Sequence, residues 1–336
     1  MIKPRSSFFP LARLTCVEIP RQPALLLLST TLILFIGSLP FLITHNLGEA
    51  GKLVRDSAMA VMFLGSLLLA VPSACNAVST EIRRGTAGAI LSKPVSRIRF
   101  LAAKFIGVSM VMVVFSGMCM VAILLADRAA AIEFSVGWRY LIPLYLALLG
   151  AYVLAGILNF TTRRPFASTA FWCMAGLLVL AFVWTLFLRD QGGEVTIIDH
   201  GGHTHETAGP SEAVPVRWSL VPACLLITMA ALMIQALALL CALRLAVVPS
   251  LSVCSGFFLI GLISDYLLAE RAVEALWAKL LYLILPNWQH FWMADALTAG
   301  GQVPWSYVAQ AGIYAAAWTG GLLCIAFGCF DRMEVC

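Results

Sequence analysis

The residues best suited to metal chemistry gather in one polar stretch, DHGGHTHE. His200, His203 and His205 lie there between Asp199 and Glu206. Imidazole and carboxylate groups are ligands that zinc and copper take in proteins. The glycines of this stretch are equally typical of a flexible solvated loop, and no second ligand cluster accompanies it. The three histidines are therefore weak metal candidates, with a solvated loop as the competing interpretation.

A nucleotide site is missing from the sequence. A phosphate-binding loop needs G-x-x-x-x-G-K-[ST], whose backbone amides hold the phosphates. The only Gly-Lys pair, Gly51 and Lys52, has Asn46 where the first glycine belongs, and Leu53 follows it. An intramembrane enzyme needs paired carboxylates, histidine clusters or Ser-His pairs at membrane depth, and the apolar runs contain none. We therefore expect no enzymatic activity and no cofactor in this chain.

Charged side chains are almost absent from those apolar runs. Lys104 and Asp265 come closest, each near the end of a run, and each can reach an interface by snorkelling. Asn76, Asn159 and Gln235 are polar without charge and are typical of hydrogen bonds between helices. This pattern argues against a proton-coupled carrier with a carboxylate relay at mid-membrane.

The elements that must position these residues are membrane spans. The chain has 336 residues, of which 61% are hydrophobic and 12% charged, against about 25% charged in soluble domains. Eight apolar runs are long enough to cross about 30 Å of hydrocarbon at 1.5 Å per residue. They lie near 24–44, 57–79, 101–126, 139–160, 168–188, 219–243, 251–268 and 305–330. The sequence predicts an all-α polytopic membrane protein with one transmembrane domain over residues 1–336.

The basic residues predict the orientation of the spans. If the N-terminus is cytoplasmic, the inner segments hold 14 of the 22 Lys and Arg residues. Those segments are 1–23, 80–100 with Lys104, 161–167, 244–250 and 331–336. Because short cytoplasmic loops are enriched in Lys and Arg, we expect both termini in the cytoplasm. The loops 189–217 and 269–304 are then extracytoplasmic.

The polar N-terminal stretch, residues 1–23, carries apolar residues irregularly interleaved with Arg13, Glu18 and Arg21. A short amphipathic helix in the membrane interface matches this pattern, and Pro20 and Pro23 would end it before the first span. A disordered positive leader is the alternative.

The outer loop 269–304 has apolar residues at near-helical spacing, then Pro286 and the aromatic residues Trp288, Phe291 and Trp292. Tryptophan is typical of the membrane interface. Two interfacial helices at the outer surface are the first interpretation, and a partly buried re-entrant pair is the second.

The segment 79–100, STEIRRGTAGAILSKPVSRIRF, is the most polar stretch in the first half of the chain. A helix can run from Glu81 to Leu91, because Ser79 or Thr80 can cap its start and Pro94 ends it. Arg83 and Arg84 then point away from the side that carries Ile82. A short exposed helix held between two spans has the shape to dock into a groove of another protein.

This segment also resembles a known family. EIRRGTAGAILSKPVSRIRFLAAKF is similar to the cytoplasmic segment between the second and third spans of ABC-2 type transporter permeases. The resemblance is carried by Glu81, Gly85, Thr86, Leu91, Ser92, Lys93, Pro94, Arg97 and Lys104. LARLTCVEIPRQP resembles the N-terminal elbow helix of the family, and LPNWQHFW resembles the outer helices before its last span.

The resemblance implies a function and partners. In the family this segment is a coupling helix that contacts a separate ATPase subunit, which binds ATP and Mg²⁺. The expected docking residues are Glu81, Ile82, Arg83, Arg84, Gly85, Thr86, Leu91, Ser92, Lys93, Pro94 and Arg97. The expected partners are that ATPase, a second permease chain and the lipid bilayer, with no nucleic acid. The expected location is the inner membrane of a prokaryote. A non-transporting homologue that anchors an ATPase is the alternative.

The number of spans departs from the family, whose core has six. The surplus pair is expected between the third and seventh runs. Both NFTTRRPFAS and LRLAVVPSLS resemble the family's inner loop before its fifth span, so either could belong to the additional copy.

Overall fold

The computed structural model describes residues 8–43, 50–83, 96–131, 136–187, 197–198, 204–205, 214–268, 275–276, 279, 285–298 and 301–332. In these residues eight helices are long and apolar enough to cross a membrane. The prediction of an all-α polytopic membrane protein is confirmed. In the described part of the chain, strands occur only as a two-residue antiparallel pair.

The elements follow the predicted runs, with shifted ends. The first five helical elements are α1 (Phe8–Glu18), η1 (Ile19–Arg21), α2 (Pro23–Leu42), α3 (Ala50–Arg83) and α5 (Arg97–Ala130). Next come α6 (Trp138–Thr162), α7 (Phe166–Phe187), β1 (Ile197–Ile198), β2 (Thr204–His205), α8 (Leu220–Ala242) and α9 (Val247–Leu268). The last are η2 (Trp288–Phe291), α12 (Ala294–Thr298) and α13 (Trp305–Asp331).

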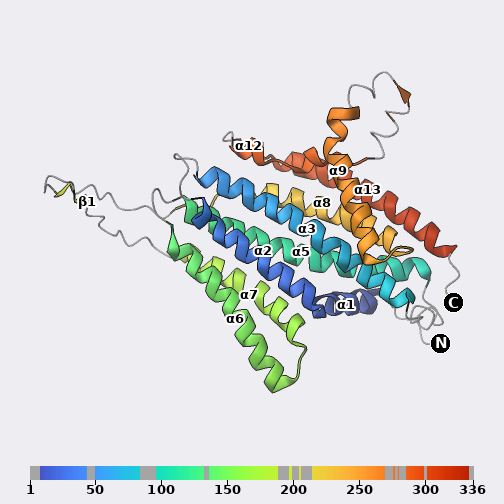
Figure 1. Ribbon diagram of the computed structural model, residues 1–336, viewed down its shortest axis with the longest axis horizontal. Helices are drawn as coiled ribbons and strands as arrows, with labels where there is room; N and C mark the ends of the chain where they lie inside the picture. Colours follow the sequence, from blue (N-terminus) through green and yellow to red (C-terminus); the bar gives the residue numbers. More distant parts are fainter. Residues whose placement is uncertain are drawn as a thin grey trace.

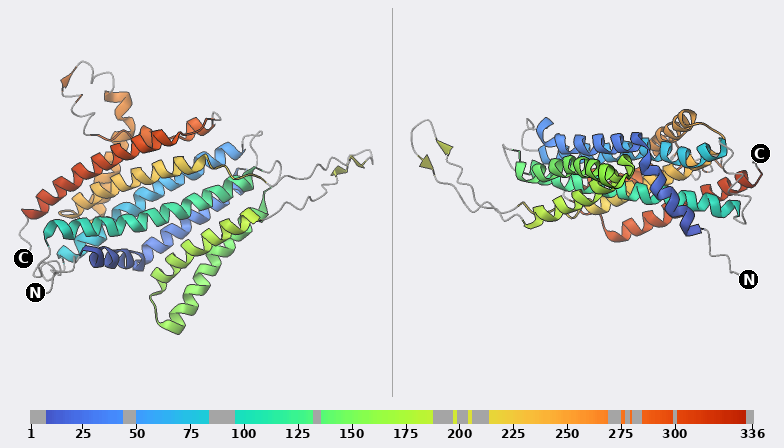
Figure 2. Two further views of the ribbon diagram at one scale, coloured as in Figure 1. Left: turned by 180° about the vertical axis from the view of Figure 1, so that it is seen from behind. Right: turned by 90° about the horizontal axis from the view of Figure 1, so that it is seen from below.

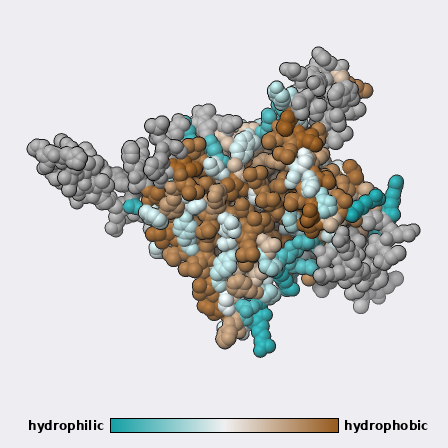
Figure 3. Space-filling model, in the orientation of Figure 1, coloured by the Kyte–Doolittle hydropathy of each residue, from teal (hydrophilic) through white to brown (hydrophobic). Residues whose placement is uncertain are grey.

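The long helices form a bundle with two distinct ends (Figure 1). Helix α1 and the last residues of α13 lie at one end, which we call the terminal end. Helix α5 ends and α8 begins at the opposite end, which we call the far end. Apolar side chains cover most of the visible face between the ends, and several polar ones lie near its margins (Figure 3). This distribution is the one a bilayer requires.

Burial separates the centre of the bundle from its edge. About 72% of the span within α3 is buried, and 67% of those within α5 and α8. Alanines such as Ala230 and Ala231 are fully buried in α8, which allows neighbouring backbones to approach closely. Only 17% of the span in α13 is buried, so this helix lies at the edge. Any force applied to α3 or α5 therefore acts on the core.

Helices α6 and α7 form a hairpin at another edge of the bundle, and only a third of each span is buried. Arg163 ends α6 in the left-handed conformation (φ 53°), and Pro165 precedes α7. The pair diverges from the bundle towards this turn (Figures 1 and 2). Tyr145 of α6 donates a 2.9 Å hydrogen bond to the Gly37 carbonyl of α2 and helps to hold the hairpin in place.

Two aromatic side chains of the described loop before α13 are buried, whereas Gln289 and His290 beside them are exposed. Trp288 and Phe291 of η2 are inaccessible to solvent, and Trp288 packs against Phe63 of α3 and Phe258 of α9. A Cβ atom on Gly261 of α9 would lie 2.5 Å from Nε1 of Trp288, so only glycine allows this approach. For residues 285–298 the arrangement is the partly buried alternative. Most of 269–284 lies outside the described residues.

Candidate functional site

The predicted coupling segment begins where α3 ends at the terminal end. Glu81, Ile82 and Arg83 continue α3 as its last turn, so the predicted helix start at Glu81 is wrong. Ser79 does not cap a new helix, because its hydroxyl donates to the Cys75 carbonyl within α3. The expected docking residues from Arg84 to Pro94, which are Arg84, Gly85, Thr86, Leu91, Ser92, Lys93 and Pro94, lie outside the described residues. The chain becomes described again at Ser96, whose Oγ accepts a 3.4 Å hydrogen bond from the amide of Arg99 and caps α5.

Arg97, the first residue of α5, is attached to the end of α13. Its Nη1 donates to the carbonyl oxygens of Phe330, at 3.1 Å, and Asp331, at 2.8 Å. Its guanidinium lies 6.0 Å from the ring centroid of Phe330, which also stacks on Phe100. The last carbonyls of a helix have no partner within the helix, so a cation at this position satisfies them. The return point of the segment is thereby joined to the last span.

Lys104 lies about two helical turns further along α5 and is fully buried. The sequence suggested that it snorkels to the interface, but α1 covers it. Its Nζ lies 3.9 Å from Oε2 of Glu18, the last residue of α1. Gly107 permits this packing, because a Cβ atom there would lie 2.6 Å from the Cβ of Thr15 and 2.7 Å from the carbonyl of Ala12. The N-terminal helix, which the amphipathic interpretation predicts, is thus seated on α5.

The far end of the bundle contains an ion cluster that sequence reasoning missed. Asp127 of α5 is buried, and its carboxylate lies 3.4 Å from Nε of Arg55 in α3 and 3.6 Å from Nε of Arg217 before α8. The predicted third span, residues 101–126, ends before Asp127 and assigns it to a loop. The helix continues to Ala130 because these charges find partners in other segments. The adjacent Asp and Arg after a long apolar run were the available signal.

Arg128, the next residue, joins two further segments. Its Nε donates to the Val214 carbonyl at 3.1 Å, and its Nη1 donates to the carbonyl and hydroxyl oxygens of Thr185 at 3.2 and 3.1 Å. Its guanidinium also lies 4.2 Å from the ring centroid of Tyr140. Arg128 therefore holds the end of α7 close to the chain that leads into α8.

Two of the three uncharged polar residues, Gln235 and Asn76, bond to another segment of the bundle, as predicted. The prediction is wrong for Asn159, which is exposed and donates to the Arg164 carbonyl in the turn between α6 and α7. Gln235 of α8 is fully buried and donates to the hydroxyl of Ser109 at 2.9 Å and the carbonyl of Phe105 at 3.1 Å, both in α5. Asn76 of α3 donates to Gln22 at 2.9 Å. These bonds cross between helices and give the bundle specificity.

The candidate metal ligands lie mostly outside the described residues. Asp199, His200, His203 and Glu206 are not described, and His205 is described only as the backbone partner of Ile197 in the β1–β2 pair. Within the described residues no group of three or more His, Cys, Asp or Glu side chains could hold a metal ion. The metal interpretation stays a prediction.

Comparison with models of protein families finds no match to this chain, and comparison with curated proteins finds no significant relative. The geometry at the terminal end and the sequence of the segment between α3 and α5 therefore carry the functional argument.

Proposed function

We propose that this chain is the permease subunit of an ATP-driven exporter of the ABC-2 type. The supporting observation is the position of the segment that resembles a coupling helix, residues 80–100, between the two longest helices of the bundle. Helices α3 and α5 have 34 residues each and so extend over about 50 Å, well beyond about 30 Å of hydrocarbon. A partner that pushes on the segment acts directly on two core helices.

The contacts at the terminal end support transmission of that movement. Arg97 joins the start of α5 to α13, and Lys104 joins α5 to α1 through Glu18. A displacement of the segment would therefore be transmitted to α1 and α13 as well as to the core helices α3 and α5. In this proposal a separate ATPase binds ATP and Mg²⁺, docks on the segment at the cytoplasmic face, and opens the export pathway outward.

The peripheral hairpin α6–α7 accounts for the surplus spans. Its two helices pack chiefly against each other, whereas α8 packs against α3, α5, α9 and α13. We assign α2, α3, α5, α8, α9 and α13 to the six-span core. On this assignment the NFTTRRPFAS turn belongs to the additional pair. The functional unit contains two permease chains and two ATPase chains in a prokaryotic inner membrane.

Affinity purification of the tagged chain from its native membranes tests the proposal. We expect an ABC ATPase to co-purify with the wild type, and Glu81→Lys or Gly85→Trp to reduce its recovery. A docked charge that loses its partner costs about 2–5 kcal/mol, or about 30-fold or more in affinity. Arg244→Gln, in the α8–α9 turn at the same end, is the control and should recover the ATPase normally.

ATP hydrolysis provides a second test of the proposed coupling. Hydrolysis by the recovered complex should depend on the permease in the wild type and lose that dependence in Glu81→Lys. Recovery of no ATPase with the wild type, or equal recovery and equal coupled hydrolysis in all four proteins, would contradict the coupling role.

A further inference from the structure

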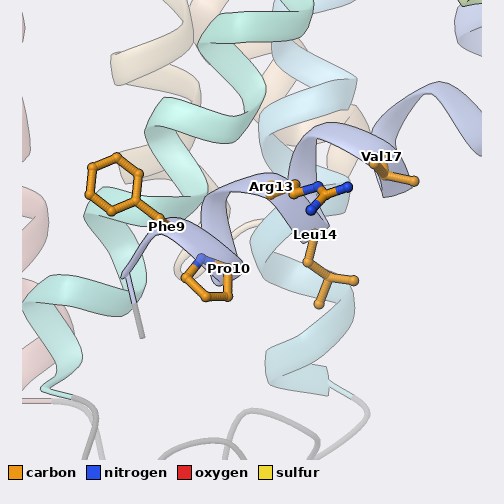
Figure 4. A pocket seen from close by; sticks show the side chains of 5 residues that line it. All are labelled: Phe9, Pro10, Arg13, Leu14 and Val17. Carbon is orange, nitrogen blue, oxygen red and sulfur yellow. The ribbon is translucent and has the colours of Figure 1, made fainter. Parts of the chain in front are cut away.

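The outward face of α1 contains a shallow hollow of about 500 Å³. Phe9, Pro10, Arg13, Leu14 and Val17 line it, all from this one helix (Figure 4). The opposite face of α1, with Ala12 and Thr15, is buried against α5. The hollow therefore faces away from the bundle.

The lining of the hollow is apolar around a single cation. Phe9 is 75% exposed and Leu14 is 57% exposed, which is costly in water and favourable at the edge of a bilayer. Arg13 is exposed, and among the described residues it has no hydrogen bond or ion pair. It is the only cation of α1, and the only acid of that helix, Glu18, lies beside Lys104.

This combination matches an anionic phospholipid. A guanidinium binds phosphate oxygens through two parallel hydrogen bonds, and apolar side chains beside it accept acyl chains. A zwitterionic headgroup brings its own cation, so its net attraction to an uncompensated arginine is weaker. The charge on Glu18 is compensated by Lys104, which leaves the face with a net positive charge.

We propose that α1 carries a binding site for an anionic phospholipid, in which Arg13 binds the headgroup phosphate and Phe9, Leu14 and Val17 contact the acyl chains. The bound lipid holds α1 in the plane of the membrane interface against α5. The site does not depend on the transport role proposed above, because it requires only α1 and the bilayer.

Native mass spectrometry of the purified full chain tests the site. The protein is released from nanodiscs that contain equal amounts of phosphatidylglycerol and phosphatidylcholine. We expect the wild type to retain phosphatidylglycerol in preference. Arg13→Gln should reduce that retention about tenfold or more, because it removes the charged hydrogen bonds to the headgroup phosphate. Arg13→Lys should keep most of the retention, and Arg244→Gln, an exposed arginine outside the hollow, should keep all of it.

Several outcomes would overturn the site. These are equal retention of the two lipids by the wild type, unchanged retention in Arg13→Gln, or an equal loss in Arg244→Gln. Loss of a co-purifying protein from Arg13→Gln without loss of lipid would mean that the face docks a protein instead. Size-exclusion elution at the wild-type volume shows that each variant is folded before its lipids are counted.

Discussion

Asp127 of α5 lies 3.4 Å from Arg55 of α3 and is buried with it at the far end of the bundle. The same carboxylate lies 3.6 Å from Arg217, whose side chain is 47% exposed. The carboxylate of Asp127 thus pairs with two guanidinium groups, the buried one of Arg55 and the partly exposed one of Arg217. A buried charge that loses its partner cannot be rescued by water, whereas an exposed one can.

We therefore predict that Asp127→Asn destabilises the protein strongly, by about 3 kcal/mol, because it removes the carboxylate that lies 3.4 Å from the buried Arg55. Arg217→Gln should lower the free energy of unfolding by under about 1 kcal/mol. Asp127 then still pairs with Arg55, and the Arg217 side chain is partly solvated in the folded protein. Thermal unfolding in detergent measures both. A thermal unfolding midpoint of Asp127→Asn that is no lower than that of Arg217→Gln would contradict the buried Asp127–Arg55 pair.

Gly107→Ala should lift α1 from α5, because the added Cβ meets Thr15 at 2.6 Å and backbone at 2.7 Å. Overpacking of this kind costs about 1–3 kcal/mol. The matched control is Gly117→Ala on the same helix, where nothing lies within 4 Å of an added Cβ atom. Equal thermal midpoints for the two variants would show that α1 does not pack at Gly107.

The thiol of Cys16 reports the seating of α1 independently. Burial raises the pKa of Cys16, so little thiolate is present at neutral pH and labelling is slow. In the wild type, the labelling rate should climb with pH beyond the range where an ordinary cysteine levels off. Displacement of α1 by Gly107→Ala should lower the pKa towards its ordinary value and speed labelling at pH 7. Site-resolved mass spectrometry of maleimide adducts measures it, and an unchanged pH profile would count against the prediction.

Arg97→Ala should loosen the last turn of α13. It removes two hydrogen bonds from a cation to the Phe330 and Asp331 carbonyls, each bond of this type contributing about 1.5 kcal/mol or more. Amide exchange near the end of α13 should become about tenfold faster or more. Arg99→Ala, exposed on the same turn of α5, is the control and should leave that exchange unchanged. Equal protection in both variants would refute the link.

A cysteine at position 202 tests the orientation. In a background without native cysteines, Gly202→Cys should react with an impermeant maleimide in intact cells. Arg244→Cys should react only after lysis. The reason is the excess of Lys and Arg in the segments assigned to the cytoplasm. The reverse pattern would invert the topology and place the coupling segment outside.

The spans could be predicted from the sequence because hydropathy and length are local properties. All eight runs became helices, yet their ends shifted. Helix α5 extends past the predicted end to include Asp127 and Arg128, whose partners come from α3, α6, α7 and the chain before α8. A helix can continue through charged residues when distant segments supply partners for their charges. The local sequence does not show which partners the fold will bring together.

The candidate site was predictable in part for the same reason. The N-terminal helix follows from its local pattern, but the burial of Lys104 depends on α1 lying over it. The contact of Arg97 with α13 joins residues more than two hundred positions apart. Neither contact follows from residue type or spacing within the segment. The choice between α6–α7 and α8–α9 as the peripheral pair likewise required packing, because all four helices are uniformly apolar.

Asp127 and Arg128 are consecutive residues, so their side chains leave α5 about 100° apart. Asp127 reaches Arg55 of α3 and Arg217 before α8, and Arg128 reaches α7 and Val214, also before α8. Turning α5 about its own axis would stretch one set of bonds as it compressed the other, so this helix resists torsion at the far end. Any displacement of α5 that keeps these bonds intact must therefore pivot at the far end, with the larger movement at the terminal end.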